Sequence, residues 1–274
     1  MEDRKTVYLK AKKEELIKRI KEKGSIIVAF SGGVDSSVVS ALAYEALGEN
    51  ALAVTIDTPL LPPTELDYAK KIANYIRINY AIVRLNEFEI PEFRTNPRNR
   101  CYLCKKFRFK KLKEIAKREG FKEIAEGTNI SDLGQYRPGL QAAQEEKIYH
   151  PLVEAALTKE DTRMMAKQMH LTNADKPANT CLASRVPYGQ ELTVEKLERI
   201  AEAEEYIRNE TDVKVLRVRD HGNLARLEVG VDERKLFYNE EIMSKIAKKL
   251  KQLNYKFVTL DLEGYRFGTF DENK

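Results

Sequence analysis

Two glycines and three serines lie together in the segment Ser31-Gly32-Gly33-Val34-Asp35-Ser36-Ser37, directly after a short apolar run. Glycine lets a backbone turn tightly and approach an anion closely, and the amides that open a helix favour a phosphate there. The hydroxyls of Ser31, Ser36 and Ser37 can donate hydrogen bonds to phosphate oxygens. No lysine follows the glycines, so this is not a Walker-type loop. The pattern predicts a phosphate-binding loop between a strand and a helix.

Two carboxylates accompany this segment. Asp35 could help to coordinate Mg²⁺, although an acidic residue in the first turn of a helix is also favoured by the helix dipole alone. Asp57 ends the next predicted strand, where α/β sheets hold nucleotides, but it could equally be a turn residue.

The chain has three cysteines. Cys101 and Cys104 form a Cys-x-x-Cys, which in an intracellular protein is redox-active, metal-binding or accidental. A structural zinc site needs four ligands and would have to recruit a histidine, from the set His150, His170 and His221. An iron–sulfur cluster normally takes four thiolates, so Cys101, Cys104 and Cys181 would leave one iron open to a ligand such as hydrosulfide. Unconnected thiols and a structural metal remain as alternatives.

Basic residues surround these cysteines. They would lower thiol pKa values and attract anions, and they are Arg98, Arg100, Lys105, Lys106 and Arg185. Residues 94–118 carry a net charge of +10, whereas the whole chain carries +5. The sequence therefore places its basic charge around the Cys-x-x-Cys, where anionic reactants would have to meet.

Elements that position these residues follow from the periodicity of the apolar side chains. Strands are predicted over residues 25–30, 51–57, 80–85, 123–126 and 148–152, and helices over 34–47, 63–78 and 107–119. This alternation predicts an α/β fold with a doubly wound parallel sheet. Ligands of such sheets bind beyond the carboxyl ends of the strands.

The pattern changes after residue 190. The apolar periodicity there predicts a second, smaller α/β domain. Its elements are a helix over 193–209, strands over 213–218 and 224–229, a helix over 232–253 and a strand over 256–262. We therefore expect domains over residues 1–190 and 191–274. Arg217 and Arg219 share one face of a strand and could clamp a phosphate. Arg226 and Glu228 share a face of the next strand, and solvated side chains or structural ion pairs are the alternative.

Composition excludes several classes of protein. The longest apolar run, Ile26–Phe30, is far shorter than the roughly 20 residues of a membrane-spanning helix. Residues 1–15 are charged throughout, which is unlike a secretion signal. Three cysteines cannot all pair within one chain, which argues against a disulfide-stapled secreted protein. We expect a cytoplasmic globular protein with no membrane contact, and the mild net charge alone does not predict nucleic-acid binding.

The phosphate loop resembles the SGGxDS loop of PP-loop ATP pyrophosphatases. Beyond it, the chain as a whole is similar to the LarE family of ATP-dependent sulfur transferases. The similar segments are Arg100-Cys101-Tyr102-x-Cys104-Lys105, Glu126-Gly127-Thr128-Asn129, Arg137-Pro138-Gly139, Cys181-Leu182-Ala183-Ser184-Arg185, Pro187-Tyr188-Gly189, residues 217–222, residues 225–228 and Gly264-Tyr265-Arg266-x-Gly268.

This resemblance implies that ATP with Mg²⁺ adenylates a carboxylate of pyridinium-3,5-biscarboxylic acid mononucleotide and that sulfur then displaces AMP, for a nickel-pincer nucleotide cofactor. It implies catalytic roles for Asp35, Cys181 and Arg185. Binding roles are implied for Ser31, Gly32, Gly33, Asp35, Ser36, Ser37, Asp57, Gly127, Arg217, Arg219 and Glu228. The chain departs from one-cysteine members, in which the residue matching Cys181 gives up its own sulfur. It is similar to three-cysteine members, which hold a 4Fe–4S cluster.

The resemblance also implies a homo-oligomer that uses sulfide or another sulfur donor. Ser131-Asp132 stands where two acidic residues are expected, which weakens a metal role there. One alternative function is a PP-loop transfer-RNA thiolase, which the basic stretch Lys105–Arg118 leaves open, although no RNA-binding appendage is evident. A second is a non-catalytic sensor of nucleotide or of an iron–sulfur cluster.

Overall fold

The computed structural model describes residues 4–134, 138–177 and 180–266 of the chain. It divides into two compact units: residues 1–87 with 99–178, and residues 88–98 with 179–274. The sequence predicts a boundary at residue 190, whereas the second unit takes in residues 88–98 and resumes at residue 179. Arg137 and Gly268, from two of the similar segments, lie outside the described residues.

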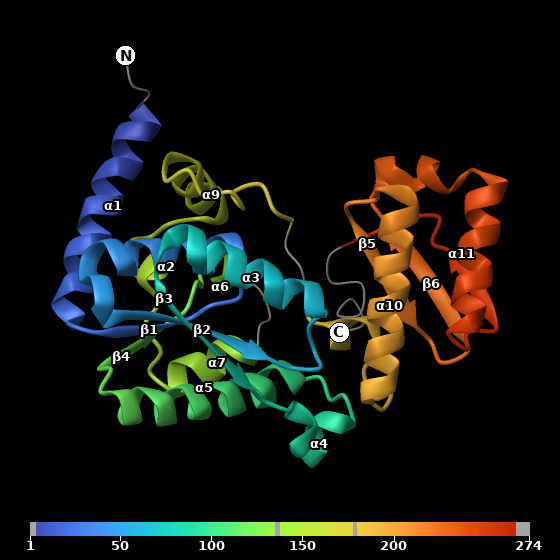
Figure 1. The fold of residues 1–274 in the computed structure, drawn as a ribbon, viewed down its shortest axis with the longest axis horizontal. Helices are drawn as coiled ribbons and strands as arrows, with labels where there is room; N and C mark the ends of the chain where they lie inside the picture. Colours follow the sequence, from blue (N-terminus) through green and yellow to red (C-terminus); the bar gives the residue numbers. More distant parts are fainter. Residues whose placement is uncertain (1–3, 135–137, 178–179, 267–274) are drawn as a thin grey trace. The chain divides into compact units, whose positions relative to one another are not determined.

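The first unit is built on a four-stranded parallel sheet (Figure 1). Its strands are β1 (Ile26–Ala29), β2 (Ala51–Asp57), β3 (Asn79–Arg84) and β4 (Glu123–Ala125), in the order β3-β2-β1-β4. The strands are short and apolar, as expected where helices cover both faces of a sheet. The predicted α/β fold with a parallel sheet is confirmed.

Helices cover the two faces of this sheet in separate groups (Figure 1). One group comprises α1 (Arg4–Lys23), α2 (Val34–Leu47), α3 (Pro63–Ile76) and α9 (Lys159–Gln168). The other comprises α5 (Arg100–Glu119) and α7 (Pro138–Glu145). Alternate residues of β1 face opposite cores: Val28 packs with the first group and Ile27 with the second. The short elements of this unit are η1 (Gly48–Asn50), α6 (Ile130–Leu133) and α8 (Pro151–Glu154).

The strand order reverses at β1. The chain runs outward from β1 through β2 to β3, and then returns to place β4 on the other side of β1. The segment after β1 carries the predicted phosphate loop, and the segment after β4 carries Gly127. Both segments therefore leave the carboxyl edge of the sheet at its topological switch point, where α/β folds bind ligands.

The second unit holds a three-stranded sheet in the order β5-β6-β7, with β5 (Leu216–Asp220) antiparallel and β7 (Phe257–Leu260) parallel to β6 (Leu224–Val229). Apolar side chains of α10 (Val194–Thr211) and α11 (Glu240–Gln252) pack on this sheet. Short elements are α4 (Pro91–Arg94), η3 (Leu182–Arg185) and η4 (Val231–Phe237), and η2 (Glu87–Glu89) lies at the unit boundary. The expected order helix–strand–strand–helix–strand is present.

Three predicted elements differ from the structure. The single helix predicted over 232–253 is η4 followed by α11, because the Asn239 side chain accepts hydrogen bonds from the Glu241 and Ile242 amides and starts a new helix. The strand predicted over 148–152 is one bridge from Tyr149 to Ala125, since Pro151 begins α8. Helix α5 begins at Arg100 rather than 107, so it includes the Cys-x-x-Cys. No helix in the described ranges is both long and apolar enough to cross a bilayer.

Candidate functional site

The segment from Ser31 to Gly33 connects β1 to α2 as predicted. Gly33 is the N-cap of α2, with φ −75° and ψ 165°, and no side chain of the described residues caps the helix there. The Ser36 hydroxyl donates to the Gly33 carbonyl (3.1 Å) and accepts from the Ser31 amide (3.3 Å). The loop is thus folded by its own serines, and the first amides of α2 are left for an anion.

Two glycines permit close backbone contacts around this loop. Gly32 has φ +70°, and a Cβ there would lie 2.8 Å from the Cα of Ala69 in α3. A Cβ on Gly127 would lie 2.6 Å from the Ser36 amide nitrogen. Real Cβ atoms do not approach so closely, so a side chain at either position would displace the loop or the first turn of α2. The structure therefore brings Gly127 against the first turn of α2, and its role in binding a cofactor stays a prediction.

Asp35 lies in the first turn of α2 and is mostly buried. Its Oδ2 pairs with Lys159 Nζ of α9, whereas its Oδ1 is buried and has no hydrogen-bond partner among the described residues. Burial raises the pKa of Asp35, and the charge of Lys159 opposes that shift. A buried carboxylate oxygen without a donor fits a Mg²⁺ ligand, since Mg²⁺ prefers carboxylate oxygens. The residues present thus fit the magnesium ion that the sequence predicts.

Lys159 and Asn173 are site residues that sequence reasoning missed. Asn173 is buried, and its side-chain nitrogen donates to the Gly32 carbonyl (2.9 Å) and the Ser37 hydroxyl (2.8 Å). One sequence pattern could have indicated the position of Lys159. Thr158 and Asp161 form a capping box, which marks the start of α9 at Lys159. No local pattern points to Asn173.

Asp57 ends β2, as predicted, and its Oδ2 accepts a hydrogen bond from the Arg84 Nε (3.2 Å). Arg84 ends the neighbouring strand β3 and is almost fully exposed, so this pair is a weak surface ion pair. Asp57 therefore lies at the carboxyl edge of the sheet with its carboxylate accessible, and its role in nucleotide binding stays a prediction.

Glu126 anchors α5 to the end of β4. Both oxygens of its carboxylate accept hydrogen bonds from Lys105 Nζ (2.8 and 2.7 Å). The carboxylate also accepts a hydrogen bond from the Thr128 hydroxyl (2.9 Å) and pairs with His150 (3.2 Å). Burial acts to raise the pKa of Glu126, but the His150 hydrogen bond and the charge of Lys105 outweigh it and lower the pKa to about 2. Lys105, one of the basic residues expected to attract anions near the thiols, is therefore engaged in an ion pair.

Cys101 lies in the first turn of α5 and Cys104 follows three residues later, so the two lie on one face of the helix. The Cys104 thiol contacts Glu87 Oε1 (3.6 Å), which also accepts from Arg108 Nε (2.7 Å). Cys181 belongs to the other unit, as the residue before η3. In the ranges that the structure describes, no three or more His, Cys, Asp or Glu side chains are grouped to hold a metal.

The basic stretch over residues 94–118 is largely neutralised by acidic partners. Lys106 pairs with both Glu145 and Glu146 (3.1 and 2.5 Å), and Lys113 pairs with Glu146 (2.5 Å). Several lysines of this stretch are therefore paired with glutamates that follow it in the sequence. This pairing weakens the electrostatic case for a nucleic-acid ligand.

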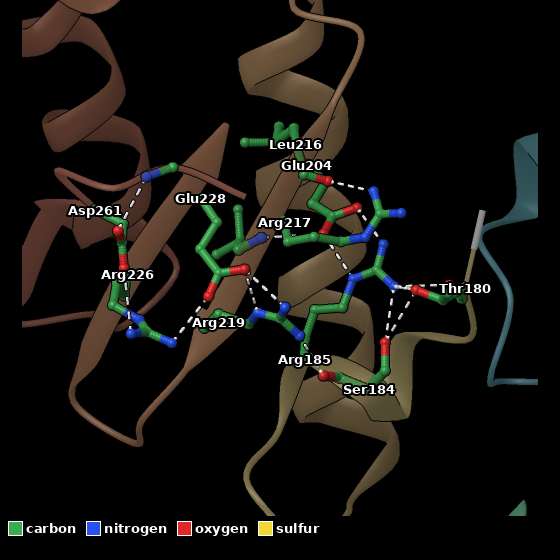
Figure 2. A network of polar contacts seen from close by, with 12 residues as sticks. Thr180, Ser184, Arg185, Glu204, Leu216, Arg217, Arg219, Arg226, Glu228 and Asp261 are labelled. Carbon is green, nitrogen blue, oxygen red and sulfur yellow. Dashed lines mark hydrogen bonds and ion pairs between the residues drawn. The ribbon is translucent and has the colours of Figure 1, made fainter. Parts of the chain in front are cut away.

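Arg185 is fully buried and contacts Thr180, Ser184 and Glu204 (Figure 2). Cys181 directly follows Thr180 in the sequence. It donates from Nε and Nη2 to the two oxygens of Glu204 (2.8 and 3.0 Å). Its Nη1 donates to the Thr180 carbonyl (2.7 Å) and the Cys181 carbonyl (3.2 Å). The guanidinium thus links α10 to the backbone carbonyls of Thr180 and Cys181. We predicted a catalytic role for Arg185, and its contacts are those of a residue that positions Cys181.

Arg219, Arg226 and Glu228 form a second network on the sheet of this unit, in which Arg219 and Glu228 are buried (Figure 2). Arg219 pairs with one oxygen of Glu228 (2.7 Å) and Arg226 pairs with the other (2.9 Å). Arg219 also donates to the Ser184 carbonyl (2.7 Å), next to Arg185. Arg219, one of the two arginines of the predicted phosphate clamp, is therefore part of a structural network with Glu228 as its acceptor.

Arg217 lies opposite Glu228 in the β5–β6 ladder and its guanidinium stacks over the Tyr265 ring, with 5.1 Å to the centroid. Burial and the nearby charge of Arg185 lower its pKa to about 10. A guanidinium whose charge is opposed by burial and by a second cation favours an anion beside it. The role of Arg217 in binding a phosphate stays a prediction.

Comparisons with known proteins agree with this geometry. Residues 8–99 match the family described as NAD synthase. The chain is 40% identical to an uncharacterised protein of Synechocystis sp. over 260 residues, which is 95% of this chain and 97% of that protein. It is 32% identical over 265 residues, 96% of this chain and 95% of the relative, to the pyridinium-3,5-bisthiocarboxylic acid mononucleotide synthase of Lactiplantibacillus plantarum. It is 34% identical over 256 residues, 93% and 95% of the two chains, to an uncharacterised protein of Methanocaldococcus jannaschii.

The parallel sheet and the phosphate loop at its switch point define a PP-loop protein, a class to which the NAD synthase match also points. Within that class, the chain belongs to the LarE family, because its similarity to the bisthiocarboxylic acid mononucleotide synthase extends over both units.

Proposed function

We propose that the chain is an ATP-dependent sulfur transferase. It adenylates a carboxylate of pyridinium-3,5-biscarboxylic acid mononucleotide, releases pyrophosphate and converts the acyl-adenylate to a thiocarboxylate for a nickel-pincer nucleotide. The observation that carries this proposal is the phosphate loop whose Asp35 keeps a buried, unpartnered oxygen at the switch point of the sheet. Similarity to the synthase of Lactiplantibacillus plantarum supports the choice of substrate.

The first step is adenylation. A carboxylate oxygen of the substrate attacks the α-phosphorus of ATP, and the bond to the bridging oxygen of pyrophosphate breaks. The amides that open α2 hold the departing pyrophosphate, because the N-terminus of a helix favours an anion. Asp35 would hold Mg²⁺, which when bound neutralises phosphate charge. Adenylation is needed because hydroxide is a poor leaving group, whereas AMP is a good one.

The second step is sulfur transfer. In the sacrificial route, the Cys181 thiolate attacks the activated carbonyl carbon and AMP leaves with its electron pair. Removal of the Cα proton of Cys181 then breaks its Cβ–Sγ bond, which leaves dehydroalanine in the chain and a thiocarboxylate on the substrate. Arg185 keeps the Cys181 backbone in one conformation through its bonds to the Thr180 and Cys181 carbonyls.

We also propose that Cys101, Cys104 and Cys181 ligate a 4Fe–4S cluster. Three thiols suit such a cluster with one open iron, at which the bound group would supply a sulfide in place of the Cys181 sulfur. The position of Cys101 in the first turn of α5 favours a thiolate there. The sulfur donor, the cytoplasmic location and the homo-oligomer stay predictions.

Anaerobic turnover with ATP, Mg²⁺ and the dicarboxylate tests the proposal. We expect pyrophosphate, AMP and a thiocarboxylate product. The Cys181→Ala variant should still release pyrophosphate but make no thiocarboxylate. The Asp35→Asn variant should be impaired both in pyrophosphate release and in thiocarboxylate formation. Absence of pyrophosphate from the wild-type protein would refute adenylation and favour a sensor.

Iron and sulfide analysis of the anaerobic protein tests the cluster separately. We expect the wild-type protein to bind iron and to turn over repeatedly. The Cys101→Ala variant should lose both the iron and the repeated turnover. Intact-mass analysis after turnover distinguishes the two sulfur routes. Loss of the elements of H₂S at Cys181 marks the sacrificial route, and an unchanged mass with product marks cluster-mediated transfer.

A further inference from the structure

Asn173 reaches the phosphate loop from a segment far away in the sequence. It follows α9 and lies 136 residues from Ser37. Its side chain is 1% exposed, and its Nδ2 lies 2.9 Å from the Gly32 carbonyl oxygen and 2.8 Å from the Ser37 hydroxyl oxygen. One amide group therefore contacts both the loop and the first turn of α2.

The Gly32 carbonyl fixes the orientation of this amide. A carbonyl oxygen only accepts hydrogen bonds, so the nitrogen of Asn173, and not its oxygen, must face Gly32. The second hydrogen of that nitrogen then points to the Ser37 oxygen, which accepts it. Both amide hydrogens are used, and the Asn173 Oδ1 is buried with no partner among the described residues.

This arrangement dictates where the Ser37 hydroxyl hydrogen goes. The Ser37 oxygen receives a hydrogen from Asn173, so its own hydrogen must leave in another direction. No described group of the chain accepts that hydrogen in the structure. The Ser37 hydroxyl is thus held as a donor whose acceptor is missing, at the helix end where an anion is expected.

We propose that Asn173 is a positioning residue of the phosphate loop, which orients the Ser37 hydroxyl to donate to bound pyrophosphate. This inference rests on the phosphate site of the proposed function and adds to it a residue that acts from outside the loop. Asn173 also keeps the Gly32 carbonyl occupied, so that this acceptor is not turned toward the anion. The unpartnered Oδ1 is a second sign of a ligand, because a buried acceptor is normally satisfied.

A double-mutant cycle on pyrophosphate binding tests the proposal. The affinity of the full-length protein for inorganic pyrophosphate with Mg²⁺ is measured by calorimetry for wild type, Asn173→Leu, Ser37→Ala and the double variant. Leucine matches asparagine in shape but donates nothing. We expect Asn173→Leu to weaken binding about tenfold, which corresponds to about 1.4 kcal/mol. In the Ser37→Ala background the same change should cost less than about threefold, because the hydroxyl that Asn173 orients is gone.

Asn173→Asp provides an independent arm of the test. The substituted oxygen accepts instead of donating, so it should draw the Ser37 hydrogen away from the ligand and weaken binding more than Asn173→Leu does. Asn74→Asp, at an exposed position of α3, controls for the added charge and should bind as wild type does. Thermal unfolding verifies that each variant is folded, and Asn173→Ser replaces Asn173→Leu in the cycle if the latter is not.

Equal losses from Asn173→Leu in both backgrounds would overturn the proposal, because a purely structural residue gives additive effects. Wild-type binding that is undetectable would overturn it as well, together with the phosphate site of the proposed function. If pyrophosphate binds and the cycle is non-additive but no thiocarboxylate forms, only the sulfur-transfer function fails. The two proposals are therefore separable.

Discussion

Lys159 of α9 forms an ion pair with Asp35 of α2, although the two residues lie 124 positions apart in the sequence. The phosphate loop contains no lysine of its own. The fold therefore supplies a cation to the loop from a distant helix, and this cation also compensates the buried Asp35 carboxylate. The same contact places Lys159 where the negative charge of a phosphate would gather.

Replacing Lys159 should weaken nucleotide binding. In Lys159→Met, the Asp35 carboxylate loses its compensating charge and repels the phosphates of ATP. We expect a loss in ATP affinity of about tenfold, or about 1.4 kcal/mol, measured by calorimetry. Lys167→Met is the matched control, since Lys167 lies on the same helix in an exposed pair with Asp175. Equal affinities of Lys159→Met and the control would rule out this role.

A methyl group on Gly127 should disturb the phosphate loop. The added Cβ would press on the Ser36 amide, 2.6 Å away, and move a donor of the anion site. Such overpacking costs about 1–3 kcal/mol, and we expect ATP binding to fall at least about tenfold. Gly134→Ala is the control, because Gly134 has φ −79° and no heavy atom of the described residues lies within 4 Å of its added Cβ. Loss of binding in both variants would mean that the effect is not specific to the loop.

Glu126 should make the stability of the protein depend on acid pH. Its folded-state pKa of about 2 lies below the ordinary value of 4.5, so the ionised form is favoured by folding. That contribution is complete above pH 4.5 and is lost as the pH falls toward 2; it amounts to about 3 kcal/mol. Chemical denaturation of Glu126→Gln across this range should show a shallower pH dependence than wild type. Glu22→Gln, at an exposed position of α1, should retain the wild-type slope.

Arg185 and Glu204 should depend on each other for the stability of the second unit. Both are buried, and Arg185→Met would leave the Glu204 carboxylate without its bidentate partner. Breaking a buried pair costs about 3–5 kcal/mol, whereas replacing both members by apolar residues can be near neutral. We expect a clear fall in Tm for Arg185→Met and substantial recovery in Arg185→Met/Glu204→Leu.

Sulfur transfer should remain low in that double variant, because the turn around Cys181 has lost the bonds to its carbonyl groups. Lys235→Met, at an exposed position of η4 in the same unit, serves as the control for removing a charge. Full transfer activity in the stable double variant would show that Arg185 does not position Cys181.

The local features of the phosphate site were predictable from the sequence. A short apolar strand, two glycines and a helix with Asp35 in its first turn are contiguous, and the structure keeps them in that order. The parallel sheet was also predictable, because apolar strands alternate with amphipathic helices. The ends of the elements were less predictable. The pattern of apolar residues around Asn239 is continuously helical, but the hydrogen bonds of the Asn239 side chain start a new helix there.

Tertiary structure alone decided which residues meet at the site. The strand order brings the segments after β1 and β4 to one edge of the sheet, and so Lys159, Asn173 and Gly127 reach the loop. Contacts between residues so far apart in the sequence leave no local periodicity that could predict them. Folding also decided which charges are available. The sequence shows eleven basic residues over 94–118, but Glu126, Glu145 and Glu146 neutralise several of them through pairing that depends on the packing of α5. By itself, the sequence determined the chemistry of the loop and the number of thiols, because both follow from residue identity.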